Sequence, residues 1–142
     1  AAHFPWLGTN VLDHAGRPWP GMTDLKLIEV GGYKLGFLGL LTPETATLST
    51  PGPEVVFAPV AETARDVVRA LKAQGADLII ALTHQDLSDD RALITRVDGI
   101  DIVYEEPLPG IGVDNFQIPA GLLPLRKRSG RSCSRKLPGA TG

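Results

Sequence analysis

The chain has 142 residues, of which 43% are hydrophobic and 21% are charged, a composition typical of a globular domain rather than a disordered protein. The single cysteine, Cys133, excludes an internal disulfide framework, and no apolar run is long enough to cross a bilayer. The formal net charge of -2 hides an asymmetry, because residues 121–142 hold 6 Lys or Arg residues and no acid. The first residues do not form a signal peptide, and without an initiator Met the chain is expected to begin inside a longer protein.

The first part of the chain predicts an irregular start followed by a β-hairpin. Residues 1–24 are rich in Pro and Gly and are expected to be irregular. Two strands are predicted over 25–30 and 33–41, joined by Gly31-Gly32, which can adopt the positive φ angles of a tight turn. The second strand is almost wholly apolar and is therefore expected to enter the core.

A loop over 42–53 and a short strand over 55–58 are expected next, before an amphipathic helix. Pro59 suits the first position of this helix, and Gly75 suits the residue after its end. The apolar face is predicted from the helical spacing of Val60, Ala64, Val67, Val68 and Leu71.

The chain then alternates between strand and helix. Residues 77–82 predict a strand buried on both faces. Ser88 is expected to cap a short helix that ends at Gly99, with an inward face formed by Leu93, Ile94 and Val97. Residues 100–104 predict another strand. This order favours an α/β architecture with parallel neighbouring strands.

Helical and strand periodicity stops after Tyr104. Residues 105–142 contain five prolines, and the basic stretch 126–136 has no apolar face to bury. We therefore expect an irregular, disordered tail. This basic stretch also lacks aromatic residues that could stack on bases, so no nucleic-acid partner is expected.

His84 is the strongest candidate for a functional residue. It follows the strand 77–82, at the carboxyl end where α/β sheets place ligands and catalytic groups. An imidazole there is a good ligand for zinc, manganese or iron. The alternative is that Thr83 and His84 only finish the strand. One histidine does not make a metal site, because roughly 3–4 protein ligands are usual.

Other polar residues have simpler explanations. Three carboxylates that could add ligands follow closely: Asp86, Asp89 and Asp90. Acidic residues behind Ser88, however, are what a helix N-terminus favours. His3 and His14 have no ligand spacing and are expected in surface loops. Gly36 and Gly39 do not form a phosphate loop, because no Lys-Ser or Lys-Thr pair follows them.

Five parts of the sequence carry a resemblance to a known family; in chain order they are Phe4–Val11, Gly32–Thr45, Asp77–His84, Asp90 and Gly99–Val103. Together they resemble the 5'-nucleotidase-like branch of the calcineurin-type metallophosphoesterases. The first is similar to the strand after that family's Gly-Asn-His-Glu motif, and the third to its strand with a metal-binding Thr-His. The resemblance covers residues 4–103, so residues 1–104 are interpreted as a partial metallophosphoesterase domain.

The resemblance implies part of a four-layer α/β/β/α sandwich that holds two divalent metal ions, zinc, manganese or similar, between its sheets. Of the family's ligand motifs, this sequence matches only the lone histidine, as His84. The closing Gly-His-x-His motif would follow Val103, but no histidine occurs after His84. A change of reading frame would explain this departure together with the loss of periodicity and the change in charge.

The resemblance thus implies a fragment of a metal-dependent phosphoesterase that hydrolyses nucleotide phosphate esters and is inactive as this chain. The expected partner of the complete protein is a nucleotide or other phosphate-ester substrate. The alternative is a small metal-free α/β binding or interaction module. Relatives of this kind are often periplasmic or extracellular, but the sequence leaves the compartment open.

Overall fold

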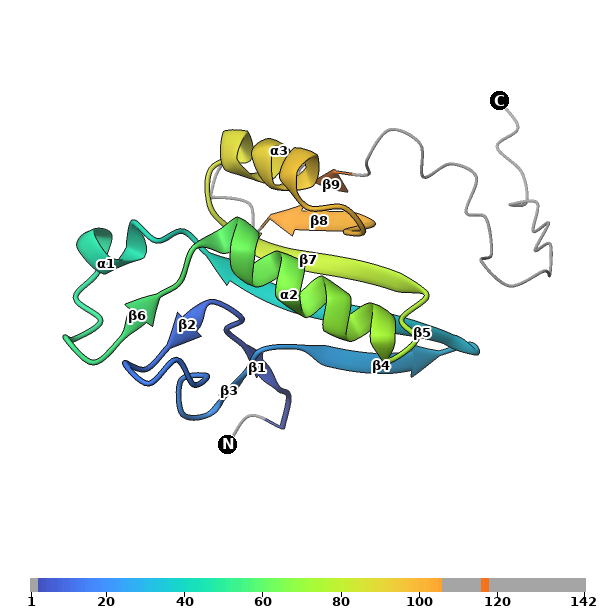
Figure 1. The fold of residues 1–142 in the computed structure, drawn as a ribbon, viewed down its shortest axis with the longest axis horizontal. Coiled ribbons are helices and arrows are strands. Elements are labelled where there is room, and N and C mark those ends of the chain that lie inside the picture. Colours follow the sequence, from blue (N-terminus) through green and yellow to red (C-terminus); the bar gives the residue numbers. More distant parts are fainter. Residues whose placement is uncertain (1–2, 106–115, 118–142) are drawn as a thin grey trace, which may run out of the picture.

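The computed structural model describes residues 3–105 and 116–117, which form a mixed α/β fold around one five-stranded sheet (Figure 1). The strand order in this sheet is β4-β5-β7-β8-β9. The elements are β1 (Trp6–Leu7), β2 (Val11–Leu12), β3 (Met22–Thr23), β4 (Lys26–Val30), β5 (Tyr33–Leu41), α1 (Thr45–Leu48), β6 (Val56–Phe57), α2 (Val60–Ala73), β7 (Leu78–His84), α3 (Leu87–Arg96), β8 (Ile102–Glu105) and β9 (Phe116–Gln117).

The predicted hairpin is confirmed. Strands β4 and β5 pair antiparallel, with Val30 opposite Tyr33 across the turn. The two turn residues, Gly31 and Gly32, have φ angles of 58° and 80°. Side chains other than glycine rarely adopt such angles, which explains the glycine pair.

The predicted parallel α/β unit is also confirmed. Strand β7 lies between β5 and β8 and pairs parallel with both. It is longer than the predicted strand 77–82, because Thr83 and His84 continue the register opposite Leu40 and Leu41 of β5. Strand β8 starts later than predicted, at Ile102, because Asp101 first bonds to Ile79 through both its main-chain N–H and its carboxylate.

Helix α2 packs on the sheet through its predicted apolar face. Its buried residues are Ala64, Val67, Val68 and Leu71. They share one core with Leu38 of β5, Ile79 of β7 and Val103 of β8. Gly75 follows the helix with a φ of 84°, as expected for a residue that ends a helix.

Helix α3 also packs on this core, but its predicted start was wrong, and it ends at Arg96 rather than at Gly99. The predicted inward residues Leu93 and Val97 are each 2% exposed. The N-cap is Asp86 rather than Ser88, which lies inside the first turn. The carbonyl of Asp86 accepts the main-chain N–H groups of Asp89 and Asp90, and this hydrogen bonding starts the helix two residues earlier.

The N-terminal segment is more ordered than predicted. Strands β1 and β3 pair parallel, and β2 pairs antiparallel with β6. Helix α1 interrupts the predicted loop 42–53. The N-terminal segment is ordered because two of its polar side chains, Thr9 and Asn10, are buried. Asn10 donates to the carbonyl of Leu41 (2.7 Å) and accepts from its N–H (2.9 Å), so the segment is fixed to β5.

Most of the predicted tail 105–142 lies outside the described residues. Glu105 belongs to β8, and β9 pairs antiparallel with β8 through Phe116 and Gln117. These three residues are therefore strand residues, in contrast to the irregular tail predicted for them. No helix in the described part of the chain is both long and apolar enough to span a membrane.

Candidate metal-binding face

The two faces of the sheet differ in what covers them. Alternate residues of β5, β7 and β8 point toward helices α2 and α3, and there Leu38, Ala81 and Val103 are fully buried. The residues between them point to the opposite face. On that face Leu82 and Tyr104, which are register partners, remain 37% and 46% exposed. On β5 the N-terminal segment covers part of this face, because Leu7 lies against Gly39. We call the remaining surface the open face.

The open face continues across the hairpin. Ile28 pairs with Leu35 and Val30 with Tyr33, so their side chains lie on the same side as Phe37. Ile28 is 42% exposed and Val30 is 55% exposed. Exposed apolar residues gathered on one face of a sheet are typical of sites where another surface packs or a ligand binds.

His84 lies at the carboxyl end of β7 on the open face. Its neighbour Thr83 points into the helix side, where it is 4% exposed, so the alternation of the strand directs His84 the other way. His84 is exposed and pairs with Leu41 in the β5–β7 ladder. Its carbonyl accepts the main-chain N–H of Thr42 at 3.2 Å. The imidazole is thus presented at the edge of an apolar surface.

A buried polar cluster lies on the other side of the same strand end. Asp90, in the first turn of α3, has an exposed fraction of 0%. Its Oδ2 accepts the Thr83 hydroxyl at 2.9 Å, and its Oδ1 accepts the Gln85 side-chain amide at 2.8 Å. Burial raises the pKa of Asp90 above its ordinary value, against the opposing effect of these two hydrogen bonds.

The predicted site residues do not come together as a ligand set. Asp90 faces the helix side, away from His84. The sequence explained Asp90 only as an acid that is favourable at a helix N-terminus, whereas the structure also gives it hydrogen bonds to Thr83 and Gln85. Asp89 is exposed in the first turn of α3, where an acid is favourable. His3 and His14 are exposed, and His14 Nε2 lies 2.8 Å from the Pro53 carbonyl oxygen.

His84 is a suitable metal ligand, but the part of the chain that the structure describes does not place enough further ligands beside it. Imidazole is a good ligand for divalent transition metals. Within the described residues, however, no three His, Cys, Asp or Glu side chains are grouped so that they could hold a metal ion. A metal site usually needs about 3–4 protein ligands, so these residues alone do not fit a complete metal centre, and no hydrolytic step can be derived from them.

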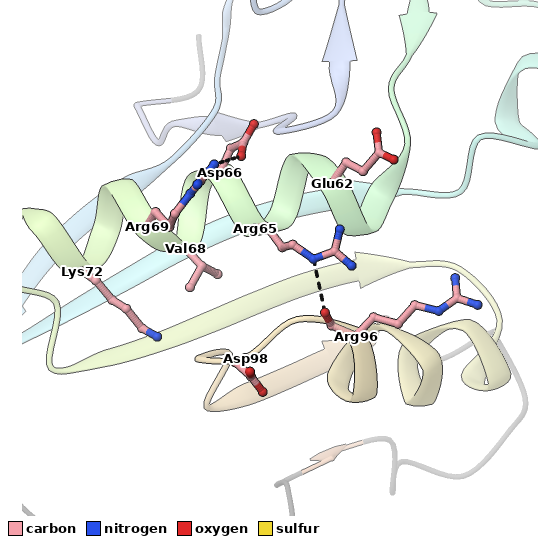
Figure 2. A pocket seen from close by; sticks show the side chains of 8 residues that line it. All are labelled: Glu62, Arg65, Asp66, Val68, Arg69, Lys72, Arg96 and Asp98. Carbon is pink, nitrogen blue, oxygen red and sulfur yellow. Dashed lines mark hydrogen bonds and ion pairs between the residues drawn. The ribbon is translucent and has the colours of Figure 1, made fainter.

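A separate groove, which the sequence did not predict, lies between α2 and α3 on the helical side (Figure 2). Its volume is about 400 Å³, and its lining carries both signs of charge: Glu62, Arg65, Asp66, Val68, Arg69, Lys72, Arg96 and Asp98. Arg65 Nε donates to the Arg96 carbonyl at 3.3 Å across it, and Arg69 pairs with Asp66. The mixed charges are typical of a solvated surface between two helices.

Comparisons with known proteins agree with each other. The chain is 34% identical over 105 residues to the snake venom 5'-nucleotidase of Crotalus adamanteus, a match covering 72% of this chain and 18% of that protein. It is 41% identical over 78 residues to the trifunctional nucleotide phosphoesterase protein YfkN of Bacillus subtilis, covering 54% of this chain and 5% of that protein. No family model matches the chain.

Solved structures show the same relationship. The fold matches a 5'-nucleotidase precursor from Thermus thermophilus with a TM-score of 0.67 and 32% identity, over 74% of this chain and 21% of that chain. It also matches the calcineurin-like phosphoesterase YfkN from Bacillus subtilis with a TM-score of 0.63 and 26% identity, over 73% of this chain and 37% of that chain.

In sequence and in fold, the chain is therefore similar to part of the calcineurin-type metallophosphoesterases. Within that class it is similar to the 5'-nucleotidases and related nucleotide phosphoesterases, which confirms the resemblance identified from its motifs. The chain spans about a fifth or less of the curated relatives that it matches.

Proposed function

We propose that the chain is part of a divalent-metal-dependent phosphoesterase that hydrolyses nucleotide phosphate esters, that His84 is one of its metal ligands, and that the chain alone is inactive. The observation that carries this proposal is the position of His84. It is an exposed imidazole at the carboxyl end of a central parallel strand, on the sheet face that α2 and α3 leave open. The likeness to nucleotide phosphoesterases supports the substrate class.

Two metal ions in a complete domain would supply an activated water and would stabilise charge on the leaving oxygen. The contribution of this chain is to position one imidazole on a rigid strand and to supply an apolar surface beside it. The described residues provide no group of three or more His, Cys, Asp or Glu side chains that could hold a metal ion. We therefore expect no hydrolysis from the chain alone, because one imidazole binds a divalent ion weakly and holds it in no defined geometry.

The catalytic part of the proposal is tested with purified chain in the presence of manganese, zinc or cobalt. AMP and bis(p-nitrophenyl) phosphate serve as monoester and diester substrates. The expected rate equals that of the metal-only blank for both the chain and its His84→Ala variant. Turnover above the blank that disappears in His84→Ala would contradict the expected inactivity and would show that the chain builds a complete site.

The parent activity is tested by sequencing the genomic DNA on both sides of the coding segment. The resemblance implies Asp-x-His and Gly-Asn-His ligand motifs besides Gly-His-x-His. We therefore expect codons for the first two upstream, and codons for Gly-His-x-His near Tyr104 in another reading frame. Flanking DNA without any of these motifs would contradict the proposal. It would instead favour a metal-free α/β interaction module, for which the exposed apolar residues of the open face offer a binding surface.

A further inference from the structure

One buried carboxylate bonds to both sequence neighbours of His84. The Thr83 hydroxyl donates to Asp90 Oδ2 at 2.9 Å, and the Gln85 amide donates to Asp90 Oδ1 at 2.8 Å. Asp90 is fully buried, whereas His84 between the two donors is exposed. The carboxylate thus spans the strand end on the side opposite the imidazole.

This arrangement restricts the backbone of His84. Fixing Thr83 on the helical side of β7 directs the next side chain to the open face. Fixing Gln85 on the same carboxylate holds the chain where it leaves the strand. Asp90 is itself fixed, because its main-chain N–H donates to the Asp86 carbonyl at 3.1 Å in the first turn of α3. The Asp90 side chain therefore connects the end of β7, the turn after it and the first turn of α3.

The bonds of Asp90 are not those of an ordinary acid at a helix start. Such an acid is favourable because it lies near the unpaired N–H groups of its own helix, usually in solvent. Here the side-chain hydrogen bonds of Asp90 are made instead to Thr83, near the end of β7, and to Gln85, directly after it. Burying a carboxylate is unfavourable unless its hydrogen bonds are made, and here they are made to the residues on either side of His84.

We infer that Asp90 is a positioning residue, which holds the Thr83–Gln85 segment so that the His84 imidazole is presented on the open face in one orientation. The inference rests on the proposed role of His84 as a ligand. Ligand orientation by groups behind the ligand is a general requirement of metal sites, where such groups affect affinity strongly.

The test is an NMR measurement on the full chain without any metal ion. The order parameter of the His84 backbone amide and the line widths of its ring signals are measured in four variants: Asp90→Ala, Asp90→Asn, Gln85→Ala and Asp89→Ala. His3 and His14 provide reference ring signals in the same spectra. Because no metal is added, the outcome does not depend on whether His84 binds one.

We expect the His84 order parameter to fall from about 0.85 to below about 0.6 in Asp90→Ala, with broadened ring signals. Gln85→Ala, which removes one of the two bonds, should give an intermediate value. Asp90→Asn should retain the wild-type value, because the amide can accept from Gln85 and donate to the Thr83 oxygen. Asp89→Ala, in the same helical turn but exposed, should leave His84 unchanged.

Val68→Ala is the control for a purely stabilising role of Asp90. It removes a buried side chain of α2 from the core and leaves Thr83, Gln85 and Asp90 unchanged. This variant should unfold more easily while His84 keeps its order parameter. A folded Asp90→Ala with unchanged His84 signals would overturn the inference. If Asp90→Ala does not fold, an unchanged His84 in folded Gln85→Ala would overturn it instead.

Discussion

Gly39 offers the sharpest test of how the N-terminal segment is held on the sheet. A Cβ atom at this position would lie 2.7 Å from Leu7 Cβ, 3.0 Å from the Leu7 carbonyl oxygen and 3.1 Å from the Leu7 carbonyl carbon. Two of these three atoms belong to the backbone, so no rotamer change can relieve the overlap. Gly39→Ala must therefore push the segment containing Leu7 away from β5.

The loss in the free energy of unfolding caused by Gly39→Ala follows from the contacts that must move. Overpacking costs about 1–3 kcal/mol. Two hydrogen bonds weaken as well, from Thr9 N–H to the Gly39 carbonyl at 2.8 Å and from Gly39 N–H to the Thr9 hydroxyl at 2.9 Å, each worth about 1 kcal/mol. The loss of glycine flexibility in the unfolded chain returns about 0.5–1 kcal/mol. With both hydrogen bonds lost, the expected net loss in the free energy of unfolding is about 2–4.5 kcal/mol.

The assay is urea unfolding followed by circular dichroism and by tryptophan fluorescence, which reports on Trp6 and Trp19 in the affected segment. Gly36→Ala is the matched control. Its new Cβ would meet only side-chain atoms, the Leu71 methyls at 2.9 and 3.1 Å and the Ala76 Cβ at 3.3 Å, so a loss of about 1 kcal/mol is expected. The reasoning is refuted if Gly39→Ala is as stable as the wild type, or if Gly36→Ala is the more costly change.

Two further predictions concern the cluster behind β7 and the open face. The raised pKa of Asp90 means that the native state binds its proton more tightly than the unfolded state, so wild-type stability relative to Asp90→Asn should fall as pH rises from 3.8 through the raised pKa. Urea unfolding of both proteins across this range checks the prediction, and the opposite slope would contradict it. The exposed apolar residues of the open face are expected to cause self-association of the chain. Leu82→Lys places a charge there and should reduce this association in light scattering, whereas Leu48→Lys, at a residue 77% exposed in α1, should not. Equal effects of the two variants would show that the open face is not the associating surface.

The sequence predicted the elements whose formation depends on local patterns. The hairpin followed from Gly31-Gly32 between two apolar runs, and α2 followed from its helical spacing of buried residues. Strand β7 was predicted too short, because its last two residues are strand through their pairing with β5 and, at Thr83, also with Glu105 of β8. The small strands of the N-terminal segment could not be predicted, since Asn10 holds them through bonds to Leu41, which is distant in sequence.

The candidate site was predictable to the same extent. The position of His84 at a strand end could be predicted because strand direction and alternation place it there. The bonds of Asp90 could not, because an acid at a helix start already has a local explanation. Its hydroxyl partner, Thr83, lies seven residues earlier and meets it only after β7 and α3 have packed together. Its second partner, Gln85, gave no sequence signal.

The most direct test of the proposed metal-ligand role is an NMR titration of the labelled chain with manganese. We predict that the ring signals of His84 and the amide signals of Gln85 and Thr42, whose N–H donates to the His84 carbonyl, broaden before those of His3 and His14. In His84→Ala the Gln85 and Thr42 amides should lose this early broadening. Broadening that begins at His3 or His14, or that persists at Gln85 and Thr42 in His84→Ala, would contradict the assignment of His84 as the ligand.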